Sequence, residues 1–393
     1  MLEIHTLVEL STYLCKHQSL KDVVVQSVDV SSIVEDVLAA KIENTVFLGC
    51  QIPDDALCSL VKFGAHIFPA LTGVPFNPYQ PVLYNAESLF NGFDSDNPCS
   101  YCKTLDARVY RYWQETGRAN PATISNALAR RLHDMAMTDA IGDFVESFAD
   151  SQKIVGMMGG HSMKRSEPAY LKAATISREL TRRGYLMVSG GGPGAMEATH
   201  VGAWFVDRSD EELAQAVAHL AEAPSYKDKQ WLAAAFRVME QYPVQQGRSY
   251  FSLGIPTWLY GHEPPTPFAS HIAKYFANSV REDGLVTIAT AGLIFAPGSA
   301  GTIQEVFQDA TQNHYATTGV SSPMVFLDEE YWTKKKPIYP LLKELAADKP
   351  YHDLVAIFDD APSVVSFIEN NPPIPSNNEH WSFCAEHCQP TVS

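Results

Sequence analysis

The sequence has no apolar stretch long enough to cross a membrane, and it has comparatively few basic residues. No window approaches the 18 uncharged apolar residues that predict a spanning helix. Its 29 Lys and Arg are outnumbered by 45 Asp and Glu, which gives a formal net charge of −16. This charge argues against nucleic acid or an anionic membrane surface as a main partner. A small anion is still possible, because a local group of backbone N–H donors can hold one.

Cysteine is also sparse, with seven residues scattered over a chain of 393. An odd number without regular spacing does not suggest a disulfide framework, and it fits a reducing cytoplasm. Residues 1–18 contain no basic segment followed by an apolar core and a cleavage site, so we expect no secretory signal.

Cys99 and Cys102 form a Cys-x-x-Cys pair within a Pro- and Asn-rich segment. Further zinc ligands are available only near the C-terminus, at Cys384, His387 and Cys388, and this spacing matches no zinc motif. We interpret the pair as loop thiols, and we expect neither a metal nor a redox cofactor.

The length and an apolar fraction of 46% predict two globular domains and a short tail. Residues 1–148 are predicted to form an N-terminal α/β accessory domain, residues 149–372 a nucleotide-binding catalytic domain, and residues 373–393 the tail. The elements expected in the first domain are a helical segment at 1–43, strands at 45–50 and 65–71, helices at 54–63, 106–114 and 123–148, and a long loop at 72–100.

In the second domain, short apolar runs alternate with helical patterns, which predicts a doubly wound parallel sheet of the Rossmann-like α/β class. The expected strands are 154–158, 185–189, 251–258, 293–296, 323–327 and 354–358. The expected helices are 167–183, 193–206, 267–280, 303–315, 337–345 and 361–370, with two more in an insertion at 208–245.

Two glycine-rich turns each follow an apolar strand and open a helix. In a doubly wound sheet such turns lie at the carboxyl ends of strands, where ligands bind. Glycine lets the backbone approach phosphate oxygens, and a helix N-terminus offers unpaired N–H groups to an anion. Taken singly, either turn may simply satisfy tight strand-to-helix geometry. The candidate phosphate- and nucleotide-binding residues are Gly190, Gly191, Gly192, Gly194, Gly298, Ser299, Ala300, Gly301 and Thr302, with Gly160, His161 and Ser162 after a third strand.

The common nucleotide-binding fingerprints are missing. The first turn does not fit G-x-G-x-x-G, because Ala195 stands where the last glycine belongs. Ser189, rather than an acidic residue that would hold a ribose diol, ends the preceding strand. The sequence also lacks G-x-x-x-x-G-K-[ST]. These absences disfavour a dehydrogenase and an ATP-hydrolysing P-loop protein.

The segments GGGPGAMEA at 190–198 and PGSAGTIQE at 297–305 resemble the paired signatures G-G-G-x-x-G and P-G-G-x-G-T-x-x-E of the Lonely Guy (LOG) family. This family was once labelled "lysine decarboxylase", and the resemblance covers residues 150–370. The GGHS segment at 159–162 and the N-terminal domain look closer to longer relatives, the bacterial pyrimidine/purine nucleotide 5′-monophosphate nucleosidases. The resemblance implies a phosphoribohydrolase that converts a nucleoside 5′-monophosphate and water into free base and ribose 5-phosphate. It also implies no cofactor, and a homo-oligomer of two or more subunits.

By the same resemblance, Arg281 and Glu305 are the catalytic pair. We expect Arg281 at the end of the helix at 267–280, and Glu305 in the first turn of the helix that follows the second motif. A carboxylate there would stabilise an oxocarbenium-like ribose and orient water, while the N–H groups of both turns hold the phosphate. Arg281 would bind phosphate or neutralise the departing base. Two positions depart from the family pattern: Ser299 replaces a glycine, and Glu282 stands where the family has Lys.

Less specific interpretations of these residues stay open. On these interpretations, Glu305 complements a helix N-terminus and Arg281 a helix C-terminus. Asp309 is expected on a solvated face or outside direct contact with the substrate, and His161 and Ser162 may be ordinary loop residues. The alternative function is a non-catalytic nucleotide-binding or sensing protein of the same fold, although an intact Glu305 favours the enzyme.

Overall fold

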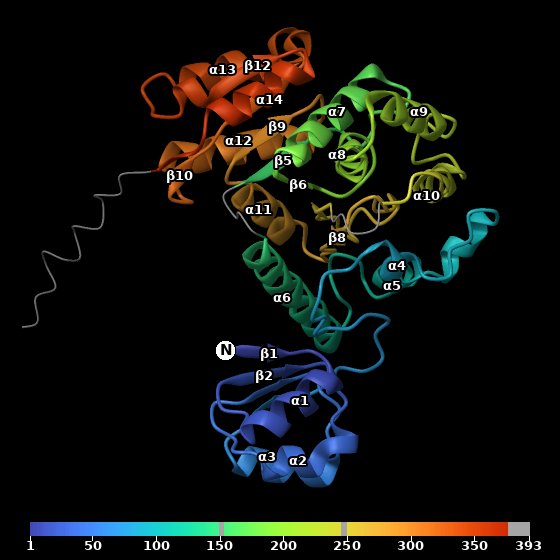
Figure 1. The fold of residues 1–393 in the computed structure, drawn as a ribbon, viewed down its shortest axis with the longest axis vertical. Helices are drawn as coiled ribbons and strands as arrows, with labels where there is room; N and C mark the ends of the chain where they lie inside the picture. Colours follow the sequence, from blue (N-terminus) through green and yellow to red (C-terminus); the bar gives the residue numbers. More distant parts are fainter. Residues whose placement is uncertain (149–152, 245–249, 376–393) are drawn as a thin grey trace, which may run out of the picture. The chain divides into compact units, whose positions relative to one another are not determined.

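The computed structural model describes residues 1–148, 153–244 and 250–375. The chain forms two compact units, coloured by sequence in Figure 1. The first unit contains Met1–Ala149 together with the short segments Thr257–His262 and Ala273–Val280. The second contains Asp150–Pro256, Glu263–Ile272 and Arg281–Ser393. Both internal segments of the first unit lie inside the range predicted for the second domain.

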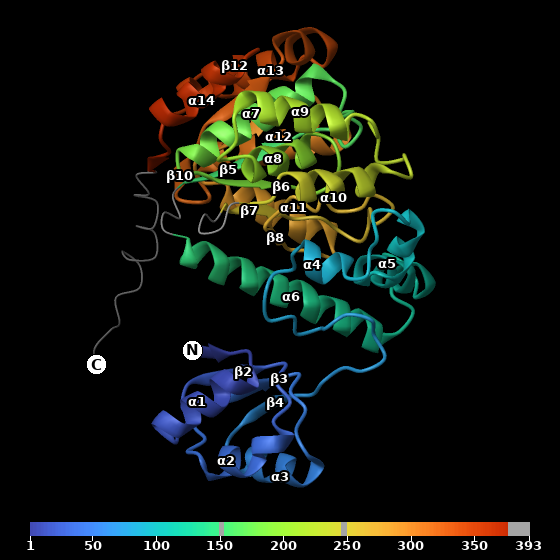
Figure 2. The same ribbon diagram turned by 45° about the vertical axis from the view of Figure 1, so that its right-hand side comes forward.

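The first unit begins with a four-stranded parallel sheet in the order β1-β2-β3-β4. Its strands follow one another along the chain, and its three α-helices lie on the same side of the sheet (Figures 1 and 2). Right-handed crossovers that all step in one direction require this arrangement. The elements are β1 (Leu2–Ile4), α1 (Leu7–His17), β2 (Val23–Gln26), η1 (Ser31–Ile33), α2 (Val34–Ala39), β3 (Val46–Leu48), α3 (Asp54–Lys62) and β4 (His66–Phe68).

The prediction of an all-helical segment at 1–43 is wrong, because two strands interrupt it. The run Val23-Val24-Val25 is buried in β2, which pairs with β1 on one side and β3 on the other. A short run of β-branched residues suits a strand buried on both faces better than a helix. The strand at 45–50 and the helix at 54–63 correspond to β3 and α3.

The remainder of the first unit is helical. The segment at 72–100, predicted as a loop, contains α4 (Ala86–Phe90) and the start of a 3₁₀ helix, η2 (Pro98–Lys103). Helices α5 (Leu105–Glu115) and α6 (Ile124–Ser147) follow. Cys99 and Cys102 lie exposed in η2, and none of the five cysteines in the described ranges forms a disulfide.

Buried charge ties the two internal segments into this first unit. Lys274 forms a fully buried ion pair with Asp106 on α5, and Trp258 Nε1 donates a hydrogen bond of 3.1 Å to the same carboxylate. Asp134 on α6 accepts hydrogen bonds from the backbone N–H of Phe276 at 2.7 Å. No sequence pattern indicated these long-range contacts.

The second unit is built on a seven-stranded parallel sheet in the order β12-β11-β9-β5-β6-β7-β8. The chain starts in the middle at β5, moves outward through β6 to β8, and returns to the other side of β5 at β9. The strands are β5 (Ile154–Met158), β6 (Leu186–Ser189), β7 (Ser252–Gly254), β8 (His271–Ile272), β9 (Gly292–Phe295), β11 (Met324–Leu327) and β12 (Val355–Phe358). The predicted doubly wound, Rossmann-like α/β fold is therefore confirmed.

Helices cover both faces of this sheet, because crossovers that step in opposite directions from β5 and β9 place α7 and α12 on opposite sides. The helices are α7 (Pro168–Arg182), α8 (Ala195–Trp204), α9 (Asp210–Leu220), α10 (Trp231–Gln241), α11 (Asn278–Ile288), α12 (Ala300–Tyr315), α13 (Ile338–Leu345) and α14 (Ala361–Asn370), with a π-helical turn η3 (Tyr331–Lys335) and a 3₁₀ turn η4 (His352–Leu354). β10 (Val320–Ser321) pairs antiparallel with β13 (Ile374–Pro375) at the start of the predicted tail. Trp381, Cys384 and Cys388 lie outside the described residues.

The prediction of a helix at 267–280 is wrong. That segment contains the edge strand β8, and the next helix, α11, begins only at Asn278. β8 pairs with β7 through His271 and Ile272, and Phe268, Ala269 and Ile272 are buried without a helix. The third strand is also shorter than predicted, since β7 ends at Gly254.

Helices α7 and α8 pack closely through Gly202. A Cβ atom at Gly202 would lie 2.1 Å from the Ala174 carbonyl oxygen and 2.8 Å from Ser177 Cβ. Because both obstacles belong to the facing helix, we predict that Gly202→Ala lowers the free energy of unfolding by about 1–3 kcal/mol. Chemical denaturation measures this change.

Gly284→Ala is the matched control. Gly284 also lies inside a helix, α11, but nothing stands within 4 Å of its Cβ position. We expect that substitution to leave stability unchanged or to raise it by up to about 1 kcal/mol. Equal effects of the two substitutions would contradict close packing at Gly202.

Candidate functional site

Three turns meet at the carboxyl ends of β5, β6 and β9, where the order in which the chain adds strands to the sheet changes direction. The residues after β5 and β9 contact each other directly, because Gly160 N–H donates a hydrogen bond of 3.0 Å to the Pro297 carbonyl. The residues after β5 and β6 also touch, because Ala195 N–H lies 3.4 Å from the Gly160 carbonyl. The switch in strand order lies between β5 and β9, and ligands of doubly wound sheets bind at this point.

The turns approach backbone to backbone, which leaves no room for side chains at two of their glycines. Gly194 has φ +73°, and a Cβ atom there would lie 2.3 Å from the Gly160 oxygen. A Cβ atom at Gly159 would lie 2.5 Å from Ala195 Cβ. The structure therefore brings together all three sequence-predicted groups: Gly160, His161 and Ser162; Gly190, Gly191, Gly192 and Gly194; and Gly298, Ser299, Ala300, Gly301 and Thr302.

The second turn leads directly into α12. Ser299 is its N-cap with φ −111°, so the replacement of glycine by serine requires no left-handed backbone. Helix geometry leaves the first N–H groups of α12, at Ala300, Gly301 and Thr302, without partners inside the helix. The first turn of α12, all of which the structure describes, contains no acidic residue. The turn is therefore suited to an anion.

Glu305 lies one turn later than predicted. Because the small residues Ala300 and Gly301 are already helical, Glu305 is in the second turn of α12 rather than the first. It is 9% exposed. Burial raises the pKa of Glu305 to about 7, with Arg281 lowering it in part and Glu282 raising it. Complementing the helix N-terminus does not account for a carboxylate placed and buried in this way.

Arg281 faces Glu305, although the helix assigned to it from sequence was wrong. It belongs to the first turns of α11, so the interpretation as a helix C-terminal cation is also wrong. Its Nη1 lies 3.6 Å from Glu305 Oε1, which is an ion pair without a close hydrogen bond. A Cβ atom on Gly190 would lie 3.5 Å from the same Nη1, so the guanidinium also borders the first turn. Its buried Nε has no hydrogen-bond partner among the described residues.

Asp309 does not lie on a solvated face. It is 2% exposed, and burial raises its pKa well above the usual range. Asn313 Nδ2 donates to its Oδ1 at 3.2 Å, and Asn313 Oδ1 accepts from Ser322 N–H at 2.6 Å. The sequence carried a sign of this polar stripe, because 302, 305, 309 and 313 fall on one face of a helix.

Two residues that the sequence analysis missed lie beside the second turn. Lys336 Nζ donates a hydrogen bond of 2.9 Å to the Gly298 carbonyl, and the Tyr331 hydroxyl donates to the same oxygen. They come from η3 and the residue after it, which follow β11, the strand next to β9. Lys336 therefore brings positive charge to the turn at the N-terminus of α12.

A buried neutral histidine supports the first turn. Gly191 N–H donates to Ser189 Oγ at 3.1 Å, and Ser189 Oγ lies 2.8 Å from His200 Nε2. His200 Nδ1 lies 3.0 Å from Ser252 Oγ on β7. Burial lowers the pKa of His200 to about 3, so the ring stays uncharged at neutral pH. Ser189 thus fixes the turn. It stands where many Rossmann-like folds have an acidic residue that binds ribose.

A further group of side chains, from His161, Glu263 and Tyr226, lies beside the first turn. His161 Nδ1 is 3.8 Å from Glu263 Oε1, and the His161 ring meets the Tyr226 ring edge to face with centroids 5.9 Å apart. A Cβ atom on Gly192 would lie 3.9 Å from Glu263 Oε2. Glu263 and Tyr226 carry no sequence motif, and only the fold brings them to this turn.

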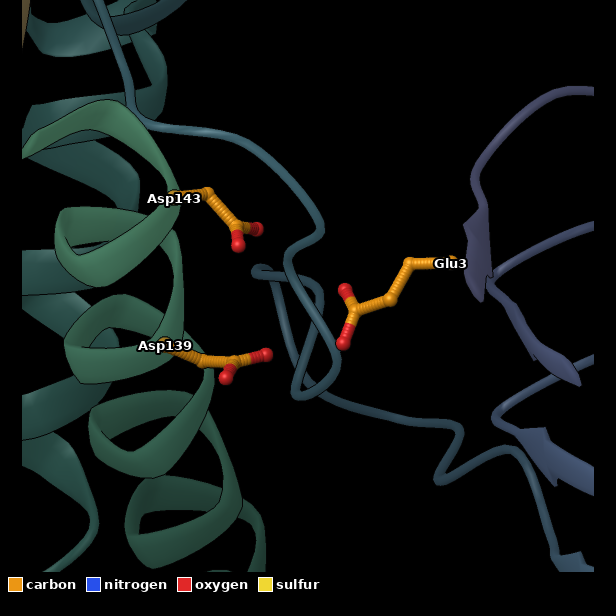
Figure 3. A group of neighbouring side chains, drawn as sticks. All are labelled: Glu3, Asp139 and Asp143. Atoms are coloured by element: carbon orange, nitrogen blue, oxygen red, sulfur yellow. The ribbon is translucent and has the colours of Figure 1, made fainter. Parts of the chain in front are cut away.

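One group of carboxylates has the spacing of metal ligands, but it lies in the first unit. The oxygens of Glu3, Asp139 and Asp143 lie within 4.8 Å of one another and point toward each other (Figure 3). Burial, followed by repulsion from the two aspartates, raises the pKa of Glu3. Acidic clusters are common on protein surfaces without a metal, and we assign none to it.

None of the helices in the part of the chain that the structure describes is long and apolar enough to cross a membrane. No protein-family model matches the sequence, and no curated protein matches it.

Among solved structures, the molybdenum cofactor carrier protein of Chlamydomonas reinhardtii is 13% identical, over 55% of this chain and 96% of its own, with a TM-score of 0.35. The molybdenum cofactor binding protein of the phototrophic bacterium Rippkaea orientalis is 15% identical, over 55% and 95%, with a TM-score of 0.32. Similarity at these TM-scores supports no argument about the function of this chain.

A buried ion pair holds the start of α8, which leaves the first turn. Arg165 Nε donates 2.9 Å to Glu197 Oε2, its Nη2 pairs with Oε1, and Tyr170 donates to the same carboxylate at 2.8 Å. Both members of the pair are at most 1% exposed. Because Arg165→Met leaves Glu197 charged and unpaired, we predict a loss of about 3–5 kcal/mol in the free energy of unfolding.

Adding Glu197→Gln to Arg165→Met should restore much of that stability, because the buried charge is then removed and Tyr170 keeps an acceptor. Arg183→Met is the control, since Arg183 pairs with Glu369 on the surface and should contribute at most about 1 kcal/mol. Chemical denaturation of all three variants is the measurement. A double variant no more stable than Arg165→Met would contradict the argument.

Proposed function

We propose that this protein hydrolyses the N-glycosidic bond of nucleoside 5′-monophosphates, as the resemblance to the LOG family and its longer nucleosidase relatives implies. The products are the free base and ribose 5-phosphate. The observation that carries the proposal is the position of Glu305, a buried carboxylate beside Arg281, one turn inside a helix whose N-terminus is suited to a phosphate.

The second glycine-rich turn is the better place for the phosphate. The N–H groups at the start of α12 have no acidic neighbour in their own turn, and Lys336 adds positive charge beside Gly298. In the first turn, the N–H groups of Gly191 and Ala195 already face Ser189 Oγ and the Gly160 carbonyl. A phosphate dianion is therefore best held at the second turn.

With the phosphate at that turn, the chemistry assigned to Glu305 follows from its place on the same helix. As the bond between C1′ and the base nitrogen breaks, positive charge develops on the ribose ring, and the carboxylate stabilises it. Water adds to C1′, and its proton passes to Glu305. The base leaves with the bonding electron pair and takes up a proton, while the Arg281 guanidinium neutralises its developing negative charge.

The raised pKa of Glu305 suits this role. A general base works best when its pKa is close to the operating pH, because it is then ionised enough to accept a proton and basic enough to drive the transfer. Burial provides this adjustment, and Arg281 at 3.6 Å keeps an ionised fraction available.

We place the activity in the cytoplasm, which the unpaired cysteines of the described ranges support. We also propose a homo-oligomer of two or more subunits, which rests on the family resemblance alone.

Glu305→Gln tests the reaction. The variant keeps the shape of the side chain but cannot accept a proton, so nucleotide binding should stay near normal while kcat falls by about 10²–10⁴-fold. Base release from a panel of nucleoside 5′-monophosphates measures turnover, and calorimetry measures binding.

Glu344→Gln is the matched control, because Glu344 is an exposed glutamate on α13 and its replacement should change neither quantity. Turnover by Glu305→Gln equal to that of the unmodified protein would remove Glu305 from the mechanism. Tight nucleotide binding without base release from any nucleotide would instead favour a sensor.

The pH dependence provides an independent test. Since Glu305 acts as a carboxylate and its pKa is about 7, kcat should fall as the pH drops below about 7. Glu282 raises that pKa, so Glu282→Gln should lower it and move the acid limb of the profile to lower pH. A limb that moves to higher pH, or does not move, would contradict the electrostatic argument.

A further inference from the structure

A carboxylate borders the first glycine-rich turn, but it comes from the segment after β7 and not from the end of β6. Strand β6 ends in Ser189, which lacks the acidic group that holds ribose hydroxyls in many Rossmann-like folds. Glu263, which lies between β7 and β8, brings a carboxylate to the same turn. Its Oε2 lies 3.9 Å from the Cβ position of Gly192, so the carboxylate lies close to the backbone of the turn.

The segment that carries Glu263 is fixed to this turn. Thr266 N–H donates a hydrogen bond of 2.9 Å to the Gly191 carbonyl, and Thr266 is fully buried. Three residues earlier, the side chain of Glu263 is only 12% exposed. Its position is therefore set by the backbone contact of Thr266 and is not that of a loosely held surface glutamate.

One ring borders the same carboxylate, and a second ring packs against the first. His161 Nδ1 lies 3.8 Å from Glu263 Oε1, and Tyr226 meets His161 edge to face. Burial, and then the negative charge of Glu263, raise the pKa of Tyr226. Two separate segments thus bring a carboxylate and an imidazole together beside the turn, and a third segment packs the Tyr226 ring against the imidazole.

This side of the turn is unsuited to a phosphate, because the Glu263 carboxylate would repel it. A carboxylate is suited to neutral hydroxyl donors, and two oxygens match two adjacent hydroxyls. A nucleoside monophosphate carries such a pair only on its ribose, as the 2′ and 3′ hydroxyls. With the phosphate at the N-terminus of α12, the sugar hydroxyls are the groups left for this carboxylate to bind.

We propose that Glu263 accepts hydrogen bonds from the ribose 2′ and 3′ hydroxyls and thereby makes the protein selective for ribonucleotides over 2′-deoxyribonucleotides. This proposal rests on the proposed function, and it gives Glu263 the role of a specificity-determining residue.

The test compares kcat/KM for adenosine 5′-monophosphate and 2′-deoxyadenosine 5′-monophosphate in the unmodified protein and in Glu263→Gln. The full chain is used throughout. The unmodified protein should prefer the ribonucleotide, and Glu263→Gln should reduce that preference by about ten- to a hundredfold, as for the loss of a hydrogen bond to a charged group. Most of the change should come from slower use of the ribonucleotide.

Glu222→Gln is the matched control, because Glu222 is an exposed glutamate in the same insertion as Tyr226 and should leave the preference unchanged. Dissociation constants of the two nucleotides are measured alongside, so that selectivity is tested even without turnover. A thermal melt confirms that Glu263→Gln is folded.

The outcomes separate the two proposals. Base release with an unchanged ribose preference in Glu263→Gln would overturn the role of Glu263 and leave the hydrolase in place. A variant that changes the preference between adenine and cytosine nucleotides, but not between ribose and deoxyribose, would assign Glu263 to the base and overturn the proposal as well. Absence of base release from every nucleotide would overturn the hydrolase, and the two dissociation constants would then decide the role of Glu263.

Discussion

The backbone contact between the turns after β5, β6 and β9 is the constraint on which the candidate site depends. Gly160 donates to Pro297 and faces Ala195, so its two backbone groups join the other two turns. A side chain at Gly194 would collide with the Gly160 oxygen. The two glycine-rich motifs are more than a hundred residues apart in sequence, and a third turn brings them together. Glycine is therefore needed here for packing the turns against each other as well as for approaching a ligand.

Buried carboxylates occur around this contact, and the protein accommodates each in a different way. Glu197 is neutralised by Arg165 with short hydrogen bonds, so it is structural. Asp309 has its pKa raised well above the usual range by burial, and it accepts a hydrogen bond from Asn313. Glu305 differs from both, because the Arg281 guanidinium lies 3.6 Å away without a close hydrogen bond and the pKa of Glu305 is about 7. A carboxyl group whose pKa lies near neutrality can exchange a proton at neutral pH, and this property distinguishes Glu305 from the ion-paired Glu197.

The sequence was sufficient for the fold class and for most strands of the second unit. Strands buried on both faces read as short apolar runs, and 154–158 and 293–296 have this pattern. It was not sufficient where a segment is shaped by distant partners. The region at 267–280 has a composition typical of a helix, but part of it pairs with β7 as an edge strand. The part that follows is fixed by the ion pair of Lys274 with Asp106 and by the hydrogen bond from Phe276 N–H to Asp134.

Residues of the site that belong to motifs were predictable, and the others were not. Glu305 and Arg281 were identified from the motifs and lie beside each other, but Glu305 is one turn later in its helix than predicted and Arg281 belongs to a different helix. Helix boundaries are the least certain part of a sequence pattern. Lys336, Tyr226 and Glu263 carry no pattern of their own. Lys336 and Glu263 lie in segments that follow β11 and β7, and neighbouring strands of a parallel sheet present their carboxyl ends at one edge. Tyr226 comes from the helical insertion between α9 and α10.

The charges at this edge are divided between the two turns, and the division argues against equivalent roles for them. Lys336 and the free start of α12 make the second turn electropositive. The Glu263 carboxylate borders the first turn, while Ser189 and Gly160 accept hydrogen bonds from two of the N–H donors of that turn. A ligand with an anionic end and a neutral, donor-rich middle matches this polarity in one direction only. The proposed substrate, a nucleoside monophosphate, has that form, and the proposed binding mode places its phosphate at α12 and its sugar hydroxyls at Glu263.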